Sequence, residues 1–188
     1  DSLLKDCDLH GAVFINVTMK NIKMENINLS GTRLENVDMR TKGDQRPDLS
    51  DANLNCAVLI SVRMPKADLR GAYLGSSYII KSDLSDSFMS NARLTGASVT
   101  YSNLSRADLR YASLNYAMID ECDLTSANLS WAEMAYSDLR NADLTNAILN
   151  NADLENSNLN GALLKNCVLV GCNLKNADLN YANLKNAN

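Results

Sequence analysis

The sequence predicts an all-β fold, a right-handed parallel β-helix that forms a solenoid. Three observations lead to this prediction. Every fifth residue from Leu4 to Leu184 is large and apolar at 36 of 37 positions, with Asp44 as the exception. The residue two places earlier is small or β-branched at 36 of 38 positions, with Lys42 and Pro47 as the exceptions. Both rows keep one phase from end to end, so the chain consists of tandem five-residue units.

A period of five is incompatible with the common regular elements. On an α-helix the large apolar row would spiral around the axis and leave no buried face. On a straight strand five is an odd number, so successive large residues would point to opposite faces. We therefore expect each unit to be a short extended segment with its small and large residues facing inward, followed by a corner.

A chain that turns repeatedly in one sense winds into stacked coils. Parallel backbone hydrogen bonds would join the coils at a spacing of about 4.8 Å. Strand twist and the crossover rule favour the right-handed sense. Burial of each central leucine would contribute roughly 1.5–3 kcal/mol before the cost of ordering its segment, so stability should accumulate coil by coil.

One segment, residues 41–48, breaks the pattern and contains the turn signals Gly43 and Pro47. We expect one continuous domain, with first coils at 1–40, a loop at 41–48 and the main β-helix at 49–188. The loop is either a surface bulge or a contact loop, because loops on rigid scaffolds often carry binding. In the second case Lys42, Asp44 and Arg46 are its candidate contact residues.

Composition restricts the function. A formal net charge of −4 disfavours direct nucleic-acid binding, which needs a basic face. No apolar run is long enough to span a bilayer and no Lys/Arg cluster indicates membrane binding. The chain starts at Asp1 rather than Met and stops within a repeat, so we expect a fragment of a longer protein with uncapped ends.

The sequence contains no pattern typical of catalysis or metal binding. His10 is the only histidine, so a His-rich metal site cannot form, and neither its outward position nor the residues near it in the sequence mark it as the base of a triad. Cys7, Cys122, Cys167 and Cys172 occupy the small inward row, where a thiol acts as a buried apolar group. Free thiols fit a reducing compartment, such as the bacterial cytoplasm or a host cytoplasm reached by a secreted effector. We expect no enzyme and no cofactor.

The recurrent A-[DN]-L-x-x unit, clearest in residues 107–109, 142–144 and 152–154, resembles the pentapeptide-repeat family along nearly the whole chain. The resemblance implies four sides and about 20 residues per coil, hence a quadrilateral β-helix of about nine coils. The family that the sequence resembles also includes DNA-mimicking, gyrase-protecting members with protruding loops. Interaction modules in secreted bacterial effectors, some of them ubiquitin ligases, contain similar repeats.

With four sides, residues 20 apart should stack on neighbouring coils. Outward apolar residues then form three groups, and two of them, which we call patches, contain our candidate partner-binding residues; the third group is Ile148, Val168 and Val170. The first contains Tyr111 with Trp131 and Tyr116 with Tyr136. The second contains Val58 with Tyr78, Ile60 with Ile80, and Tyr73 on the preceding side. The alternative is that these ladders only stabilise adjacent strands.

Outward charges occur as acid–base pairs two residues apart: Asp38–Arg40, Asp68–Arg70, Asp108–Arg110 and Asp138–Arg140. Such pairs neutralise each other locally, and an exposed pair contributes only about 0–1 kcal/mol. They dilute the acidic face that a DNA mimic requires. We therefore favour a non-catalytic protein–protein interaction module or scaffold. The alternatives are DNA mimicry against a topoisomerase and homo-oligomeric, end-to-end assembly through the uncapped ends.

Overall fold

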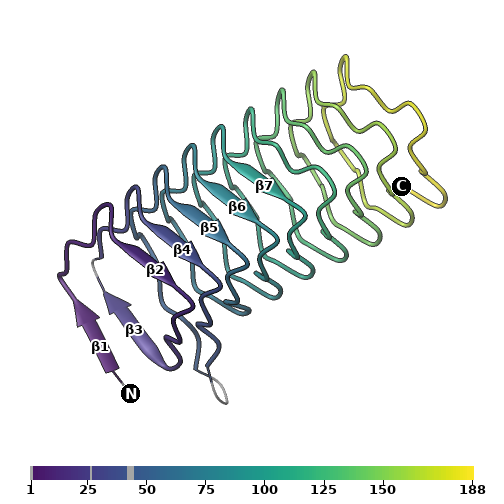
Figure 1. The fold of residues 1–188 in the computed structure, drawn as a ribbon. Helices are drawn as coiled ribbons and strands as arrows, with labels where there is room; N and C mark the ends of the chain where they lie inside the picture. Colours follow the sequence, from purple (N-terminus) through teal and green to yellow (C-terminus); the bar gives the residue numbers. More distant parts are fainter. Residues whose placement is uncertain (1, 26, 42–44) are drawn as a thin grey trace.

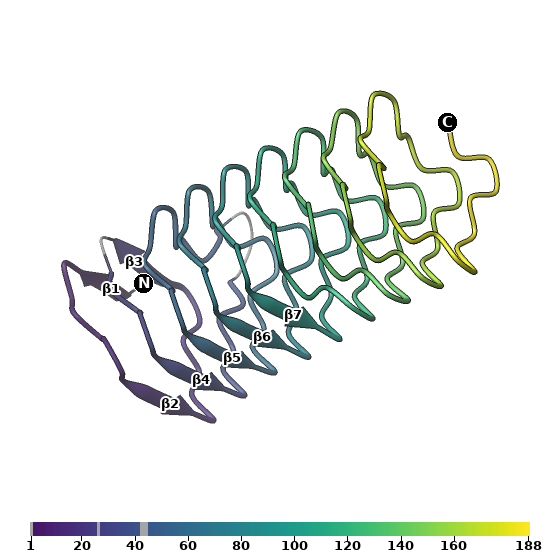
Figure 2. The same ribbon diagram turned by 90° about the horizontal axis from the view of Figure 1, so that it is seen from above.

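The computed structural model describes residues 2–25, 27–41 and 45–188, and within these residues the chain winds as a rod of stacked coils (Figure 1). The regular elements are short strands: β1 (Ser2–Lys5), β2 (Val13–Ile15), β3 (Ile22–Glu25), β4 (Arg33–Glu35), β5 (Val58–Ile60), β6 (Tyr78–Ile80) and β7 (Ser98–Thr100). All pairing is parallel, with β1 beside β3 and a second sheet in the order β2-β4-β5-β6-β7. Figure 2 shows this second sheet running along the rod.

The coil has four sides, which we name by their first residues. The β1 side begins with β1 and β3 and continues through Asp68 to Val168. The Asp8 side runs from Asp8 to Asn173, the β2 side contains β2 and β4–β7, and the Thr18 side runs from Thr18 to Asn183. Beyond residue 48, residues in register on neighbouring coils are 20 apart. The predicted four-sided, right-handed parallel β-helix is therefore confirmed.

The register shows what the break in the repeat does. Across residues 41–47 the partners Arg33 and Val58 lie 25 residues apart instead of 20, so the segment adds five residues to one coil. The regular path has resumed at Pro47, whose carbonyl accepts a hydrogen bond from the amide of Asp68. Proline is tolerated there because a residue at this inward position contacts the next coil through its carbonyl oxygen. The backbone N–H at this position serves only the local turn, so its absence in proline removes no hydrogen bond between coils. An insertion of one unit keeps the inward rows in phase.

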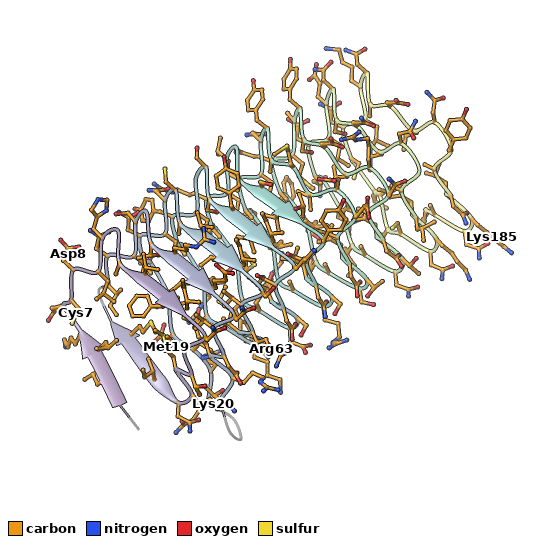
Figure 3. The ribbon with its side chains drawn as sticks, viewed as in Figure 1. Cys7, Asp8, Met19, Lys20, Arg63 and Lys185 are labelled. Carbon is orange, nitrogen blue, oxygen red and sulfur yellow. The ribbon has the colours of Figure 1, made fainter. Side chains whose placement is uncertain are left out.

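The interior consists of the two predicted rows. The large side chains that are less than 2% exposed come from the row of Leu, Met and Ile residues, such as Leu59, Leu69 and Ile79. The buried alanines come from the small row. Figure 3 shows Met19 within the coil while Lys20 and Arg63 project outward. The pleat therefore explains why apolar and charged residues alternate so regularly.

Each corner requires a left-handed backbone residue. Every described residue with positive φ has a number that ends in 1 or 6, which places it two residues after the central apolar residue. Asparagine and glycine are common there because they adopt this conformation at low cost. Tyr101, Tyr111, Tyr116, Trp131, Tyr136 and Tyr181 occupy the same position. Bulky aromatic residues enter this region at a cost, so their presence at corners calls for an explanation.

The Asp or Asn before the central leucine has a structural role that the sequence analysis did not identify. Its side-chain oxygen accepts a hydrogen bond from the backbone N–H two residues later, as in Asn128 with Ser130 and Asp143 with Thr145. This local bond satisfies an amide at the corner. The acidic residues at this position are therefore mainly turn-forming groups.

Candidate interaction surface

The first predicted patch consists of two stacked aromatic pairs on two adjacent coils. Tyr111 and Trp131 stack with ring centroids 6.4 Å apart and an interplanar angle of 10°. Tyr116 and Tyr136 stack at 5.1 Å and 7°. Each of the four side chains is more than half exposed, from 52% for Trp131 to 62% for Tyr116. The rings cover each other and still present a large apolar surface to solvent.

The two pairs lie at the two corners that bound the Asp8 side. Between them is a short strip of that side, which contains Ser113 and Asn115 on one coil and Glu133 and Ala135 on the next. The residues in the same corner positions on flanking coils are Asn91, Gly96, Asn151 and Asn156. The aromatic flanks are therefore confined to two coils.

Asn115 organises the strip. Its side-chain oxygen accepts a hydrogen bond from the amide of Ala135 at 2.9 Å, and its Nδ2 donates to Glu133 Oε2 at 3.1 Å. The first bond replaces the local cap that an Asp or Asn at position 133 would provide. The carboxylate of Glu133 is consequently directed by a neighbouring coil, and it lies between the two aromatic pairs.

The second predicted patch lies mainly on the β2 side. Val58 pairs with Tyr78 and Ile60 with Ile80 in the register of β5 and β6. Tyr78 is 50% exposed, whereas Val58, Ile60 and Ile80 are partly buried. This group is a pair of adjacent strands with limited apolar exposure.

Tyr73, the remaining residue of the second patch, lies on the Asp8 side. The guanidinium of Arg93 sits over its ring, 4.6 Å from the centroid. An internal cation therefore already covers one face of this ring, and the first patch offers the more accessible aromatic surface.

Of the predicted contact loop, Lys42 and Asp44 lie outside the described residues, and Arg46 lies within them. Arg46 packs against the β1 side, with its guanidinium carbon 4.6 Å from the ring centroid of Phe88. Its Nε lies 3.6 Å from Asp68 Oδ2. Arg46 thus fastens this part of the segment to the rod.

The Asp–Arg pairs form as predicted, with shortest nitrogen–oxygen distances of 2.6–2.8 Å. One of them differs from the expectation of solvent-exposed charges. The side chain of Asp68 is 4% exposed, because Arg70 and Arg46 both cover it. Burial alone would raise the pKa of Asp68, but hydrogen bonds from Arg70 and the charges of both arginines outweigh it and lower the pKa.

The cysteines follow the inward and outward rows. In the inward row Cys122 and Cys167 are buried, as expected, but Cys7 and Cys172 are only partly buried; Cys56 is exposed at a corner. Burial raises the pKa of the Cys122 thiol to about 12 and that of Cys167 to about 11. The thiol groups of both also donate to backbone carbonyls of the preceding coil. These thiols fill space in the coil, and burial disfavours the thiolate form that a reactive cysteine needs.

Of Cys56, Cys122 and Cys167, we expect Cys56 alone to react quickly with a disulfide reagent at pH 8. Cys122 and Cys167 should react only after unfolding, because the thiolate is the nucleophile and burial suppresses it. Timed thiol titration of the native protein, with the Cys56→Ser variant as control, measures this difference. Rapid labelling of Cys122 in the folded variant would contradict the inward assignment.

Other candidate sites offer little chemistry. His10 is exposed, with its Nδ1 2.8 Å from Ser30 Oγ. Among the described residues, no group of three or more His, Cys, Asp or Glu side chains is placed to hold a metal ion. The described part of the chain also contains no helix of the length and apolarity needed to cross a membrane.

A polar hollow of about 500 Å³ lies at the corner between the β2 and Thr18 sides, lined among others by Arg63, Lys81 and Tyr101. Asp38 and Asp83 also line it, so both signs of charge are present. Asp38 is already bound by Arg40 and Lys20. The hollow therefore lacks a single dominant charge to select a ligand.

Known proteins with this architecture were found at two levels of similarity. HetL, a pentapeptide repeat protein involved in heterocyst differentiation regulation from the cyanobacterium Nostoc sp. strain PCC 7120, is 28% identical over 97% of this chain and 89% of its own, with a TM-score of 0.62. A trypsin-treated variant of QnrB1, a plasmid-mediated fluoroquinolone resistance protein, is 19% identical over 93% and 88%, with a TM-score of 0.60. At that identity the second likeness concerns the fold alone. No significant match to a curated protein was found.

The repeat itself gives the most extensive match. Eight copies of the family described as pentapeptide repeats cover residues 7–41, 52–91, 89–125, 122–161 and 157–188. Together with the five-residue rows, the four sides and the corner geometry, this match shows that the chain belongs to the pentapeptide-repeat family.

Proposed function

We propose that this chain is a non-catalytic interaction module that binds a partner protein through its two stacked aromatic pairs. The observation that carries the proposal is the exposure of Tyr111, Tyr116, Trp131 and Tyr136 on adjacent coils. Tyrosine and tryptophan are enriched among the few residues that supply most of the binding energy in protein interfaces, because they bury large areas with few rotatable bonds. A contiguous exposed aromatic surface on a monomer typically marks such an interface.

The backbone of these residues supports binding over a purely structural role. All four have φ between 59° and 62°, a conformation that asparagine adopts more readily. Elsewhere in the rod, asparagine residues occupy the corner position on successive coils and form a ladder. Nδ2 of Asn166 donates to Oδ1 of Asn146 at 2.9 Å, and Nδ2 of Asn186 donates to Oδ1 of Asn166 at 3.2 Å. A corner therefore does not need an aromatic residue, and strained residues tend to persist where they have a function.

The double variant Tyr116→Asn/Tyr136→Asn separates the two roles. If the rings serve binding, an asparagine ladder should replace the stack and change the free energy of unfolding by less than about 1 kcal/mol. Partner binding should be lost. Binding is read by photo-cross-linking from a photoreactive residue at Met118, the exposed neighbour of Tyr116.

Tyr101→Asn is the matched control, since Tyr101 is a 52% exposed aromatic at an equivalent corner on another part of the coil. This variant should keep the cross-linked product. A double variant that is clearly destabilised and still cross-links would show that the rings only stabilise the rod.

HetL, which resembles this chain over nearly its full length, is described as involved in regulation, and this fits a binding role. Mimicry of DNA toward a topoisomerase has weaker support, because arginines neutralise Asp38, Asp68, Asp108 and Asp138. A gyrase supercoiling assay at micromolar protein should show neither inhibition nor protection. Either effect would favour mimicry instead.

A further inference from the structure

We infer that the partner contacts this surface with a basic, extended segment, whose arginine or lysine side chain pairs with Glu133 between the aromatic pairs. This inference rests on the proposed function and specifies the chemistry of the partner. We call the recognition element the Glu133 strip: Ser113, Asn115, Glu133 and Ala135, flanked by the stacked pairs.

The carboxylate of Glu133 is held in place without being neutralised. Its one identified partner is the neutral amide of Asn115, whose other end is fixed by the backbone of Ala135. Within the described part of the chain Glu133 forms no ion pair. On neighbouring sides, by contrast, Asp108 and Asp138 are paired with Arg110 and Arg140 at 2.7 Å. A cation is therefore absent here, as far as the described residues extend, although the rod supplies one to comparable carboxylates.

Charge along the Asp8 side favours a basic segment of some length. The next coil places Asp153 in register with Glu133, about 4.8 Å further along the rod. The partners of Asp153 are the amide of Asn173 and the backbone of Glu155, so no described cation pairs with it either. Two basic side chains at alternate positions of an extended peptide can reach these two carboxylates, because long side chains absorb the difference in spacing.

Toward the N-terminal end of the rod, the preference of the Asp8 side for a basic segment ends within two coils. Two coils before Glu133, Arg93 occupies the same column and covers Tyr73. The acidic pair thus begins at the aromatic flanks and extends toward the C-terminal end. Residues 95–188 contain six basic and ten acidic side chains, so the surrounding half of the rod also attracts a cation.

The aromatic flanks make the ion pair selective. The rings of Tyr116 and Tyr136 on one corner, and of Tyr111 and Trp131 on the other, can cover the aliphatic stem of a bound arginine. Water removed from both sides lowers the local dielectric and strengthens the attraction to Glu133. Charge pairs at such a site determine partner choice and register more than total affinity.

The test measures fluorescence anisotropy of a labelled twelve-residue peptide of alternating arginine and serine with the full chain. A peptide of alternating glutamate and serine is the charge control. We expect the basic peptide to bind and the acidic one not to. Glu133→Gln should weaken binding about tenfold, because the substitution removes the charge and keeps the shape.

Asp143→Asn is the matched control, since it removes one negative charge on the Thr18 side and keeps the cap on Thr145. It should change the affinity less than twofold. Equal losses in both variants would reduce the effect to general electrostatics and overturn the inference, as would absence of binding to the wild-type chain.

The failure of this inference can be distinguished from failure of the proposed function. If Glu133→Gln keeps full peptide affinity and Tyr116→Asn/Tyr136→Asn still abolishes the cross-link from position 118, the aromatic interface stands and its partner is not basic. If the aromatic variant keeps both the cross-link and peptide binding, the proposed function fails together with the inference.

Discussion

Leu139→Ala is expected to lower the free energy of unfolding by about 2–5 kcal/mol. Leu139 is fully buried in the row of large side chains that fills the coil, and neighbouring coils restrict collapse around the lost atoms. Urea denaturation followed by circular dichroism measures the difference. Because stability accumulates from coil to coil, a defect in one coil should weaken its interfaces with both neighbours.

The same substitution at Leu163 provides the control. Leu163 is 42% exposed on the Thr18 side, in an outward position. Leu163→Ala should change stability by no more than about 0.5 kcal/mol. Similar losses at both positions would show that burial does not follow the five-residue phase.

Asp68→Asn is expected to cost about 1–3 kcal/mol at pH 7, because it weakens the charge-assisted hydrogen bonds from Arg70 and the ion pair with Arg46. The folded-state pKa of Asp68 is lowered below its ordinary value near 3.9. Its stabilisation is therefore complete above that value and is lost as the pH falls through the folded-state pKa.

Chemical denaturation from pH 7 down to pH 2 tests this prediction. The stability difference between wild type and Asp68→Asn should be constant near neutrality and shrink below about pH 4. Asp143→Asn, which removes the charge and keeps the cap on Thr145, should show a much smaller difference throughout. A difference for Asp68→Asn that grows toward acid would contradict the assigned ion pairs.

The sequence was sufficient to predict the architecture, because the two inward rows admit one geometry and both rows run nearly unbroken. The stacks of Tyr111 on Trp131 and Tyr116 on Tyr136 also followed, once four sides gave a spacing of 20 residues. These features depend only on counting along a regular coil.

Features that depend on how a particular side chain orients could not be predicted in this way. The burial of Asp68 requires Arg46 to fold back from the inserted segment, and the repeat contains no information about that path. The orientation of Glu133 depends on Asn115, 18 residues earlier, which takes over a cap that position 133 lacks. One sequence signal could have predicted the orientation of Glu133. It is an Asn in the outward row, Asn115, one coil before a position where the repeat lacks its usual Asp or Asn.

Partner binding depends on position along the four-sided coil, which brings the two aromatic pairs together, and the deletion of single units tests this claim. Deletion of residues 122–126 removes one unit between the pairs, so Trp131 would move over Arg106 and Tyr136 would take its place over Tyr111. Tyr116 would then have no aromatic partner, and the second pair would be lost. Deletion of residues 157–161 removes one unit beyond them and leaves both stacks intact. Both variants should fold with the far-ultraviolet spectrum of the wild type, because every inward row keeps its phase.

The decisive measurement is binding of the alternating arginine–serine peptide, and cross-linking from position 118, in these two deletion variants. We predict that loss of residues 157–161 leaves both signals at the wild-type level and that loss of residues 122–126 abolishes them in a folded protein. Retention of both signals after deletion of 122–126, with a normal spectrum, would contradict the claim.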